Sequence, residues 1–222
     1  MASTKSAKAL ERELYGPSMA EVLLGATLSV LIGAILAAMF LIAKPVDAVR
    51  GLPEEPARNQ VYYIAGANSG GGQWLRKKQM LVEGESVELR LSENELNKWI
   101  SSAKAKDDAP EANSIFTPRG LNFRIHNDLL QIGMPADFSL LGFNRTVIVQ
   151  AEGAFAPSGE SFSYQLDRLM IGSLALHKIP VVSGLVFNRL MASQELSEDL
   201  VTAWNSLSAV SIEGDALVLE RQ

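Results

Sequence analysis

Hydrophobic and polar positions follow different periods along the chain, and the first pattern is a run without charge. Val22 to Ala43 contains no charged residue and lies between Glu21 and Lys44-Pro45. A helix over residues 22–43 would be about 33 Å long, which is enough to cross a hydrocarbon layer of about 30 Å. The run therefore predicts a transmembrane helix, since a buried core helix is seldom this long and this apolar.

A cleaved signal peptide is the alternative for this run, because Val46-Asp47-Ala48 fits a cleavage site. The apolar part of a signal peptide is about 7–15 residues long. Residues 22–43 exceed that length, so a retained signal-anchor is favoured.

The charges beside the helix do not decide its orientation. Three basic residues precede it and three follow it, namely Lys5, Lys8 and Arg12, then Lys44, Arg50 and Arg58. The tail, residues 1–21, is short, whereas the following domain is large, and large domains are translocated regardless of their charge. We expect a single-pass protein of the cell (inner) membrane, with a cytoplasmic N-terminus and a periplasmic or otherwise extracytoplasmic domain.

Small residues recur at every fourth position of the predicted membrane helix. They are Gly25, Ser29, Gly33 and Ala37. Helices in lipid associate by close packing, and small residues four apart let two backbones approach. The row predicts a packing face for self-association or for a membrane protein partner, with Ser29 adding a hydrogen bond across the contact. Small residues are also common in membrane helices, so a compositional origin is the alternative.

The chain changes character after the helix. Residues 44–60 contain three prolines and six charged residues, which is typical of an extended linker. A folded domain is predicted over residues 61–222.

Strict alternation of apolar and polar residues dominates the first part of this domain. The segments with period two are 87–91, 121–126, 130–140, 145–155 and 161–171. Short turns such as Asn127-Asp128 join the later ones, which predicts an antiparallel meander with one apolar face. Pro135 lacks a ladder donor and indicates an edge or a bulge.

Helical spacing appears between and after these strands. Ser92 and Glu95 form a capping-box pattern ahead of Leu96 and Trp99. Two more helices are predicted, one opening at Pro180 and one capped by Ser197, and the chain closes with two short strands around residues 213–215. The predicted class is α+β, an N-terminal transmembrane helix followed by an antiparallel sheet of long strands with a few helices on its apolar face. The side chains expected in the core are Trp99, Phe138, Val149 and Trp204.

Composition excludes several kinds of chemistry. The 222 residues carry a net charge of -5 and include no cysteine, so disulfides, thiolate sites and a basic nucleic-acid surface are excluded. The two histidines, His126 and His177, belong to no metal-binding pattern, and no nucleophile elbow is present. The sequence predicts no catalytic, cofactor-binding or metal-binding residue, and hence a protein that is not an enzyme.

Three stretches carry a resemblance to a known family. They are LRLSENELNKWI (89–100), LQIGMPADFSLLGFNRTVIVQAEGAFAP (130–157) and YQLDRLMIGSLALHKIPVVSGLVFNRL (164–190). With the N-terminal anchor and the final strand pair, this order resembles the YpmS-like family of membrane-anchored extracytoplasmic bacterial proteins, over about residues 87–220. Residues 61–86 and the neighbourhood of His177-Lys178 have no counterpart in that family. The resemblance implies an envelope protein without catalytic residues that handles lipid or supports a partner.

Two functions from different classes follow. The first is a non-enzymatic accessory or scaffold subunit of a membrane assembly. The alternative is a tethered domain that binds a lipid or another hydrophobic ligand. A ligand-binding domain would leave an apolar groove open, whereas a scaffold would fill its own core.

Overall fold

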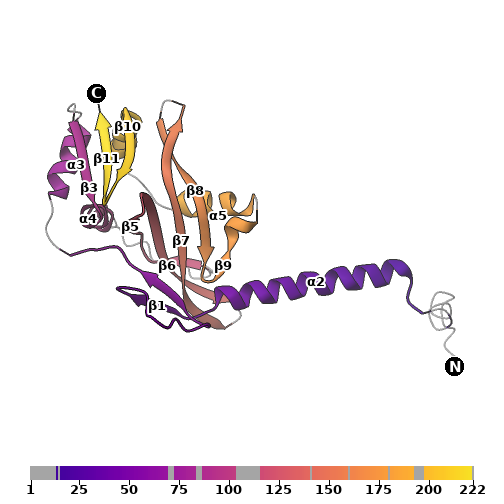
Figure 1. Cartoon of the computed structure of the whole chain (residues 1–222). Coiled ribbons are helices and arrows are strands. Elements are labelled where there is room, and N and C mark those ends of the chain that lie inside the picture. The colour runs from indigo at the N-terminus through magenta and orange to yellow at the C-terminus, as the bar shows by residue number, and fades with distance from the viewer. Residues whose placement is uncertain are drawn as a thin grey trace. The chain divides into compact units, whose positions relative to one another are not determined.

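The computed structural model divides the chain into two compact units, Met1–Leu41 and Ile42–Gln222. The residues that it describes are 14, 16–69, 73–83, 87–103, 116–140, 142–159, 161–179, 181–192 and 198–221. The N-terminal unit consists, in its described part, chiefly of one long helix. The second unit holds the strands and the remaining helices (Figure 1).

Helix α2 (Met19–Ile42) has 24 residues, none of them buried. It is long and apolar enough to cross a membrane, as the sequence predicts. The helix begins with a capping box, because the Ser18 N–H donates to Glu21 Oε2 at 3.0 Å and the Glu21 N–H donates to Ser18 Oγ at 3.3 Å. These contacts satisfy backbone donors at a helix end and extend the helix three residues before Val22.

The second unit is built around a six-stranded antiparallel sheet (Figure 1). Its strands are β4 (Phe116–Pro118), β5 (Asn122–His126), β6 (Leu129–Leu140), β7 (Phe143–Ser158), β8 (Ser161–Ile171) and β9 (Leu174–Ala175). The order is β4-β6-β7-β8-β9, and β5 pairs with β6 beside β4. The predicted meander and the α+β class are confirmed.

A second sheet and four helices complete the packing against this meander. They are α3 (Trp74–Glu83), α4 (Glu93–Ala103), α5 (Val182–Ala192) and α6 (Glu198–Asn205), with β3 (Val87–Ser92), β10 (Ala209–Glu213) and β11 (Ala216–Arg221). Strand β3 does not join the meander but pairs with β11, and β11 pairs with β10. One continuous core lies between these layers and includes Leu91, Met134, Leu169, Phe187 and Leu217.

Two of the four predicted core side chains are buried and two are not. Trp99 and Val149 expose 8% and 3% of their surface. Trp204 is half-buried. Its ring packs on the core, and its indole Nε1 donates to the Phe162 carbonyl at 2.9 Å. Phe138 is also half-buried, since it lies towards the end of β6 and outside the main core cluster. The sequence pattern identifies the correct face of each strand or helix. It does not show how far along that face other elements pack.

The predicted linker contains a strand. Strand β1 (Val46–Val49) pairs in parallel with β2 (Val61–Ile64), and Val46, Val61 and Tyr63 pack with Ile148 on the other face of the large sheet. A Cβ on Gly133 would lie 2.2 Å from the Tyr63 hydroxyl, so only glycine leaves room for that ring. The central strands are therefore covered on both faces, whereas their alternation indicated only one.

Pro135 lies inside β6 rather than at an edge. The Pro135 carbonyl accepts the Arg119 N–H at 2.8 Å. On this side of β6, the pairing with β4 ends at Ala136 and the pairing with β5 ends at Gly133. The missing proline N–H thus lies on the side of β6 where the pairings with β4 and β5 leave a gap, so its absence costs no ladder hydrogen bond.

We predict that Trp99→Ala lowers the free energy of unfolding by about 3–5 kcal/mol, because it leaves a large void in the core. Phe138→Ala should cost clearly less, since its ring is half exposed already. Urea denaturation of residues 44–222 measures both, with β1 kept in the fragment. An equal loss for the two variants would show that the end of β6 is covered as fully as the core.

Candidate functional site

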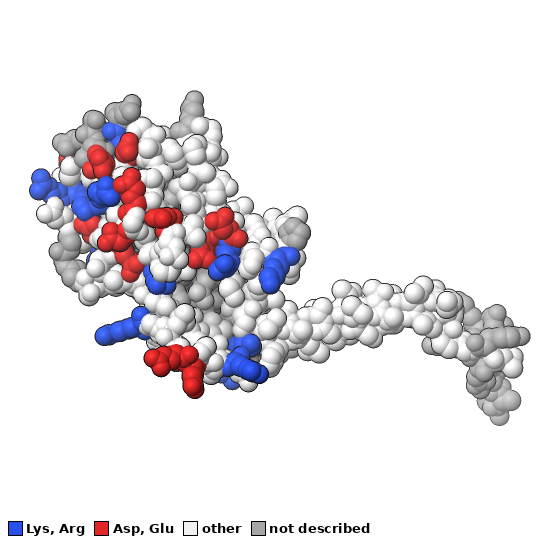
Figure 2. Space-filling model, viewed as in Figure 1, with Lys and Arg blue, Asp and Glu red and all other residues white. Residues whose placement is uncertain are grey.

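The small-residue row on α2 is the first candidate site. A Cβ added at Gly25 or Gly33 would meet no atom within 4 Å apart from the backbone of its own helix, and Ser29 and Ala37 are exposed. Positions four apart are offset by about 40° around a helix, so the row forms a gently spiralling ridge. Such a ridge matches the close, right-handed crossing of two membrane helices. Figure 2 shows α2 as an uncharged surface on the face in view, whereas charges of both signs are spread over the domain.

The hydroxyls of α2 are already used inside the helix. Ser29 Oγ donates to the Gly25 carbonyl at 2.8 Å, and Thr27 Oγ1 donates to the Leu23 carbonyl at 2.8 Å. The expected hydrogen bond from Ser29 across a helix contact would have to replace its present one. This face of α2 can therefore contribute close packing of small residues, whereas its serine hydroxyl is not free to donate to a second helix.

Nothing in the described part of the domain forms a metal centre. No group of three or more His, Asp or Glu side chains lies close enough there to hold an ion. His126 is exposed at the end of β5, and His177 places Nδ1 3.2 Å from the Leu169 carbonyl. The two histidines contribute to no common site.

A buried polar network joins α4 to β5 and to the loop after β2. Asn97, 3% exposed, donates from Nδ2 to the Phe123 carbonyl at 2.7 Å and accepts the Phe123 N–H at 2.7 Å. Its amide thereby pairs with one residue of β5 as a neighbouring strand would. The same Nδ2 donates to the Ala67 carbonyl at 3.0 Å, so Asn97 also fixes the loop.

Asn122 and Glu93 extend the network on either side. Asn122 Oδ1 accepts the Gly66 N–H at 2.6 Å and the Tyr63 hydroxyl at 2.8 Å. Glu93 accepts the Ala67 N–H with one oxygen and the Ile125 N–H, at 3.0 Å, with the other. Burial, with a smaller contribution from the charge of Glu93, raises the pKa of Tyr63 to about 12. The tyrosine remains a neutral donor, and the network serves packing rather than proton transfer.

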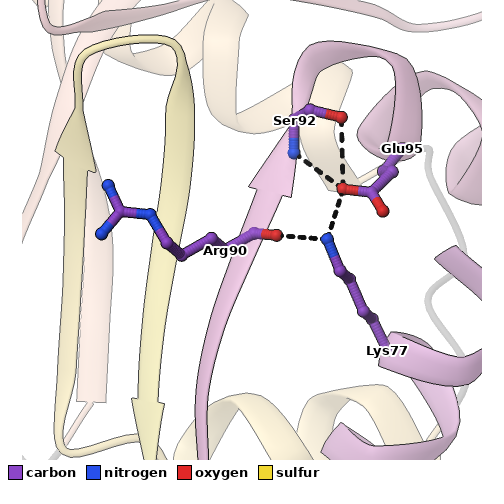
Figure 3. Close-up of polar contacts among 4 residues, drawn as sticks. All are labelled: Lys77, Arg90, Ser92 and Glu95. Carbon is purple, nitrogen blue, oxygen red and sulfur yellow. Dashed lines mark hydrogen bonds and ion pairs between the residues drawn. The ribbon is translucent and has the colours of Figure 1, made fainter. Parts of the chain in front are cut away.

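A second polar cluster centres on Glu95 (Figure 3). Glu95 Oε2 accepts from Lys77 Nζ at 2.7 Å, from the Ser92 N–H at 3.0 Å and from Ser92 Oγ at 3.2 Å. Lys77 Nζ also donates to the Arg90 carbonyl at 2.6 Å. One half of the predicted capping box is present, because the Glu95 carboxylate accepts from the Ser92 N–H. Lys77 adds an ion pair that joins α3 to the start of α4.

Glu95 is held in its charged form. Its burial alone would raise the pKa of the carboxyl, but the hydrogen bonds from Lys77 and Ser92 outweigh burial and lower it below the usual 4.5. The side chain is 8% exposed, and its Oε2 accepts from Lys77 and Ser92, so this carboxylate serves the packing of the fold. This cluster also is structural.

A hollow lies on the face of the large sheet opposite the main core. It encloses about 390 Å³ and is lined by Leu52, Tyr62, Ile64, Arg124, His126, Gln131 and Gln150. None of these residues belongs to the main core cluster. The hollow is an open depression lined by both polar and apolar side chains, and it is not the enclosed apolar pocket that a lipid carrier requires.

An exposed apolar strip marks the start of α5. Its members are Ile179, Val181, Val182 and Leu185, with exposures from 37% to 76%. Val181 has φ = 73°, a conformation that costs energy for a β-branched residue.

Comparison of the chain with protein-family models, curated proteins and solved structures gives no match. Sequence reasoning identified the α2 row directly, because its spacing is local. It missed the Asn97 network, whose only sequence signal is a pair of polar residues, Glu93 and Asn97, four apart on one helix face.

We predict that the stability of the domain depends on the Glu95 charge. A carboxyl whose pKa is lowered on folding stabilises the fold above its unfolded pKa, near 4.5, and this contribution is lost as the pH falls through its folded pKa. Glu95→Gln should therefore be less stable at pH 7 and should lose less stability than the parent on acidification below about pH 4.5.

Urea denaturation at several pH values measures this difference. The matched control is Glu88→Gln, because Glu88 has an exposed side chain and only a long contact, 3.4 Å, to Arg90. Parallel pH curves for the parent and Glu95→Gln would contradict the assignment.

Proposed function

We propose that this chain is a single-pass protein of the cell envelope with no enzymatic activity, which serves as an accessory or scaffold subunit of a membrane assembly. The observation that carries the proposal is the row Gly25, Ser29, Gly33 and Ala37 on a helix long and apolar enough to span a bilayer. A helix that served only as a tether would need hydrophobicity but no row of small residues.

The packing of the domain supports a scaffold over a carrier. The apolar face of the meander is filled by helices and by the small sheet, and its other face is partly covered by β1 and β2. The polar clusters around Asn97 and Glu95 are satisfied within the fold. The alternative function, a tethered domain for a lipid or hydrophobic ligand, gains no support from the hollow beside Tyr62 and Gln150, which is open and of mixed lining.

The proposed topology places the N-terminus in the cytoplasm and the domain outside it. A short tail and a large following domain support this orientation. The resemblance to the YpmS-like family supports the same location, since it implies a membrane-anchored extracytoplasmic protein. Native mass spectrometry of the full chain, gently extracted, would separate the two functions by the mass of what is bound, a protein or a lipid.

We predict that Gly33→Ile reduces association of the full chain several-fold without preventing membrane insertion. The branched side chain would separate two backbones at the centre of the row while it raises hydrophobicity. Co-purification of two differently tagged copies, and of native membrane partners, measures the loss.

Leu31→Ile provides the matched control. Position 31 is about 200° around the helix from both Ser29 and Gly33, so it lies on the opposite face. Equal recovery of partners with the two variants would make the row a consequence of composition and would remove the main support for the assembly function.

We predict that protease added outside sealed inner-membrane spheroplasts degrades the domain and spares the N-terminal tail. Tags at the two ends of the full chain report this by immunoblot. Protection of the domain until the membrane is lysed would reverse the topology.

A further inference from the structure

The outer face of the large sheet, opposite the main core, carries a polar row across four strands. Its members are Arg124 of β5, Gln131 of β6, Glu152 of β7 and Arg168 of β8, which are paired in this order in the ladders. Adjacent residues on β5, β6 and β7 pack in the main core, namely Ile125, Ile132 and Ala151. Successive side chains of a strand point to opposite faces, so the polar row lies on the outer face.

Hydrogen bonds and an ion pair link the polar row from end to end. Arg124 Nη1 donates to Gln131 Oε1 at 3.2 Å, and Gln131 Nε2 donates to Glu152 Oε1 at 3.1 Å. Arg168 Nη1 lies 3.1 Å from Glu152 Oε2. The row contains two guanidinium groups and one carboxylate, so one positive charge is left over.

Arg124 is the member of the row that has no acid partner. Glu152 is neutralised by the other arginine, and Glu93, which also contacts β5, accepts backbone N–H groups with both of its oxygens. Among the described residues, the Arg124 guanidinium bonds only to the neutral Gln131 amide. The side chain is half-buried, so it has lost part of its hydration without gaining a counterion. An anion placed beside it would therefore be stabilised.

The hollow on this face lies beside Arg124 and offers further hydrogen-bond donors. Its volume of about 390 Å³ is within the range of sites for small molecules. His126, two residues along β5, lies on the same face about 7 Å away and also lines the hollow. The half-buried Gln150 lines it too, and its side-chain amide bonds to no described residue. The hollow thus combines an uncompensated cation with two polar groups that can donate.

The remaining lining of the hollow is apolar or aromatic. It consists of Leu52, Tyr62 and Ile64. The Tyr62 hydroxyl accepts the Ala57 N–H at 3.0 Å, which attaches the loop between β1 and β2 to this ring. Leu52 is 70% exposed, so contact with an apolar part of a ligand would remove its surface from water. A ligand that suits the whole lining is therefore small, with one anionic and one apolar part.

We propose that this hollow binds a small organic oxyanion, a carboxylate or a phosphate ester, whose charged group pairs with the Arg124 guanidinium. The planar fork of an arginine matches both groups and binds either with two parallel hydrogen bonds. The site lies within the second unit of the chain, so it does not depend on whether α2 spans a membrane.

Nuclear magnetic resonance of the ¹⁵N-labelled full chain tests the proposal. The chain is kept in a maltoside detergent and a phosphate-free buffer without carboxylates, so that no other oxyanion competes. Benzoate, phenyl phosphate and benzyl alcohol are titrated separately, since they carry a carboxylate, a phosphate or a neutral hydroxyl on a similar ring. We expect the two anions, but not the alcohol, to shift the signals of Arg124, Gln131 and Gln150 in a saturable way. The tighter of the two anions identifies the class of ligand.

Three variants assign the binding to Arg124. Arg124→Gln should weaken binding of the tighter anion by about tenfold or more. Gln131→Glu should weaken it similarly, because it gives Arg124 a carboxylate within the protein. The matched control is Arg119→Gln, which removes the same charge from an exposed ion pair with Asp137 and should change the affinity by less than about twofold. Circular dichroism and melting without ligand check that each variant folds.

Four results would overturn the proposal. The first is the absence of saturable shifts with both anions, and the second is equal binding of benzyl alcohol, which would indicate an apolar site. The third is parental affinity in folded Arg124→Gln. The fourth is an equal loss in Arg119→Gln, which would show a general attraction of anions to the domain and not a site at Arg124.

Discussion

The fold of the domain depends on the pairing of β6 with β7. The two strands pair without interruption from Leu130 and Gly153 to Leu140 and Phe143, and the rest of the domain packs on the surface that they create. A two-stranded ribbon of this length is not stable in water by itself. It must be covered, and most of the chain outside the pair serves to cover it: helices and a small sheet on one face, and β1 with β2 on part of the other.

Covering both faces requires contacts between distant parts of the chain, and buried amides supply several of them. Asn97 stands in for a missing strand beside Phe123 and also binds the loop after β2. Since each of its four polar contacts is made within the protein, the amide is buried without leaving an unpaired donor or acceptor. The arrangement fixes the relative positions of α4, β5 and the loop, which apolar packing alone would leave free to slide.

The uncharged run was enough to predict the long apolar helix α2, and local periodicity was enough to predict the long strands and the α+β class. It also placed Trp99 and Val149 in the core, because a buried face repeats every two or every three to four residues. It did not reveal that β3 pairs with β11 rather than with the meander, nor that residues 46–49 form a strand. Both features arise from partners far away in the sequence, and a short valine-containing segment such as 46–49 has no period of its own. The half-buried Phe138 shows the same limit. Alternation identifies the face of a strand that packs, but it does not show at which residue the packing ends.

The row of small residues on α2 could be identified from sequence because it is defined by spacing within one element. The polar clusters could not, because Asn97, Asn122 and Glu93 come together only after α4 and β5 have packed. The Ser92–Glu95 pattern was an intermediate case. The contact between these two residues could be predicted from their spacing, whereas the contact of Glu95 with Lys77 depends on the placement of α3.

The pairing of β3 with β11 has a consequence for synthesis. Arg221 donates to the Leu81 carbonyl across 140 positions of sequence, and the small sheet cannot close before the last strand is available. Strands β5 to β9, which pair with their neighbours in sequence, can assemble while the chain is still emerging. During that interval β3 presents an unpaired edge, which is a site for wrong strand pairing. The small sheet therefore cannot be completed until β11 has been synthesised.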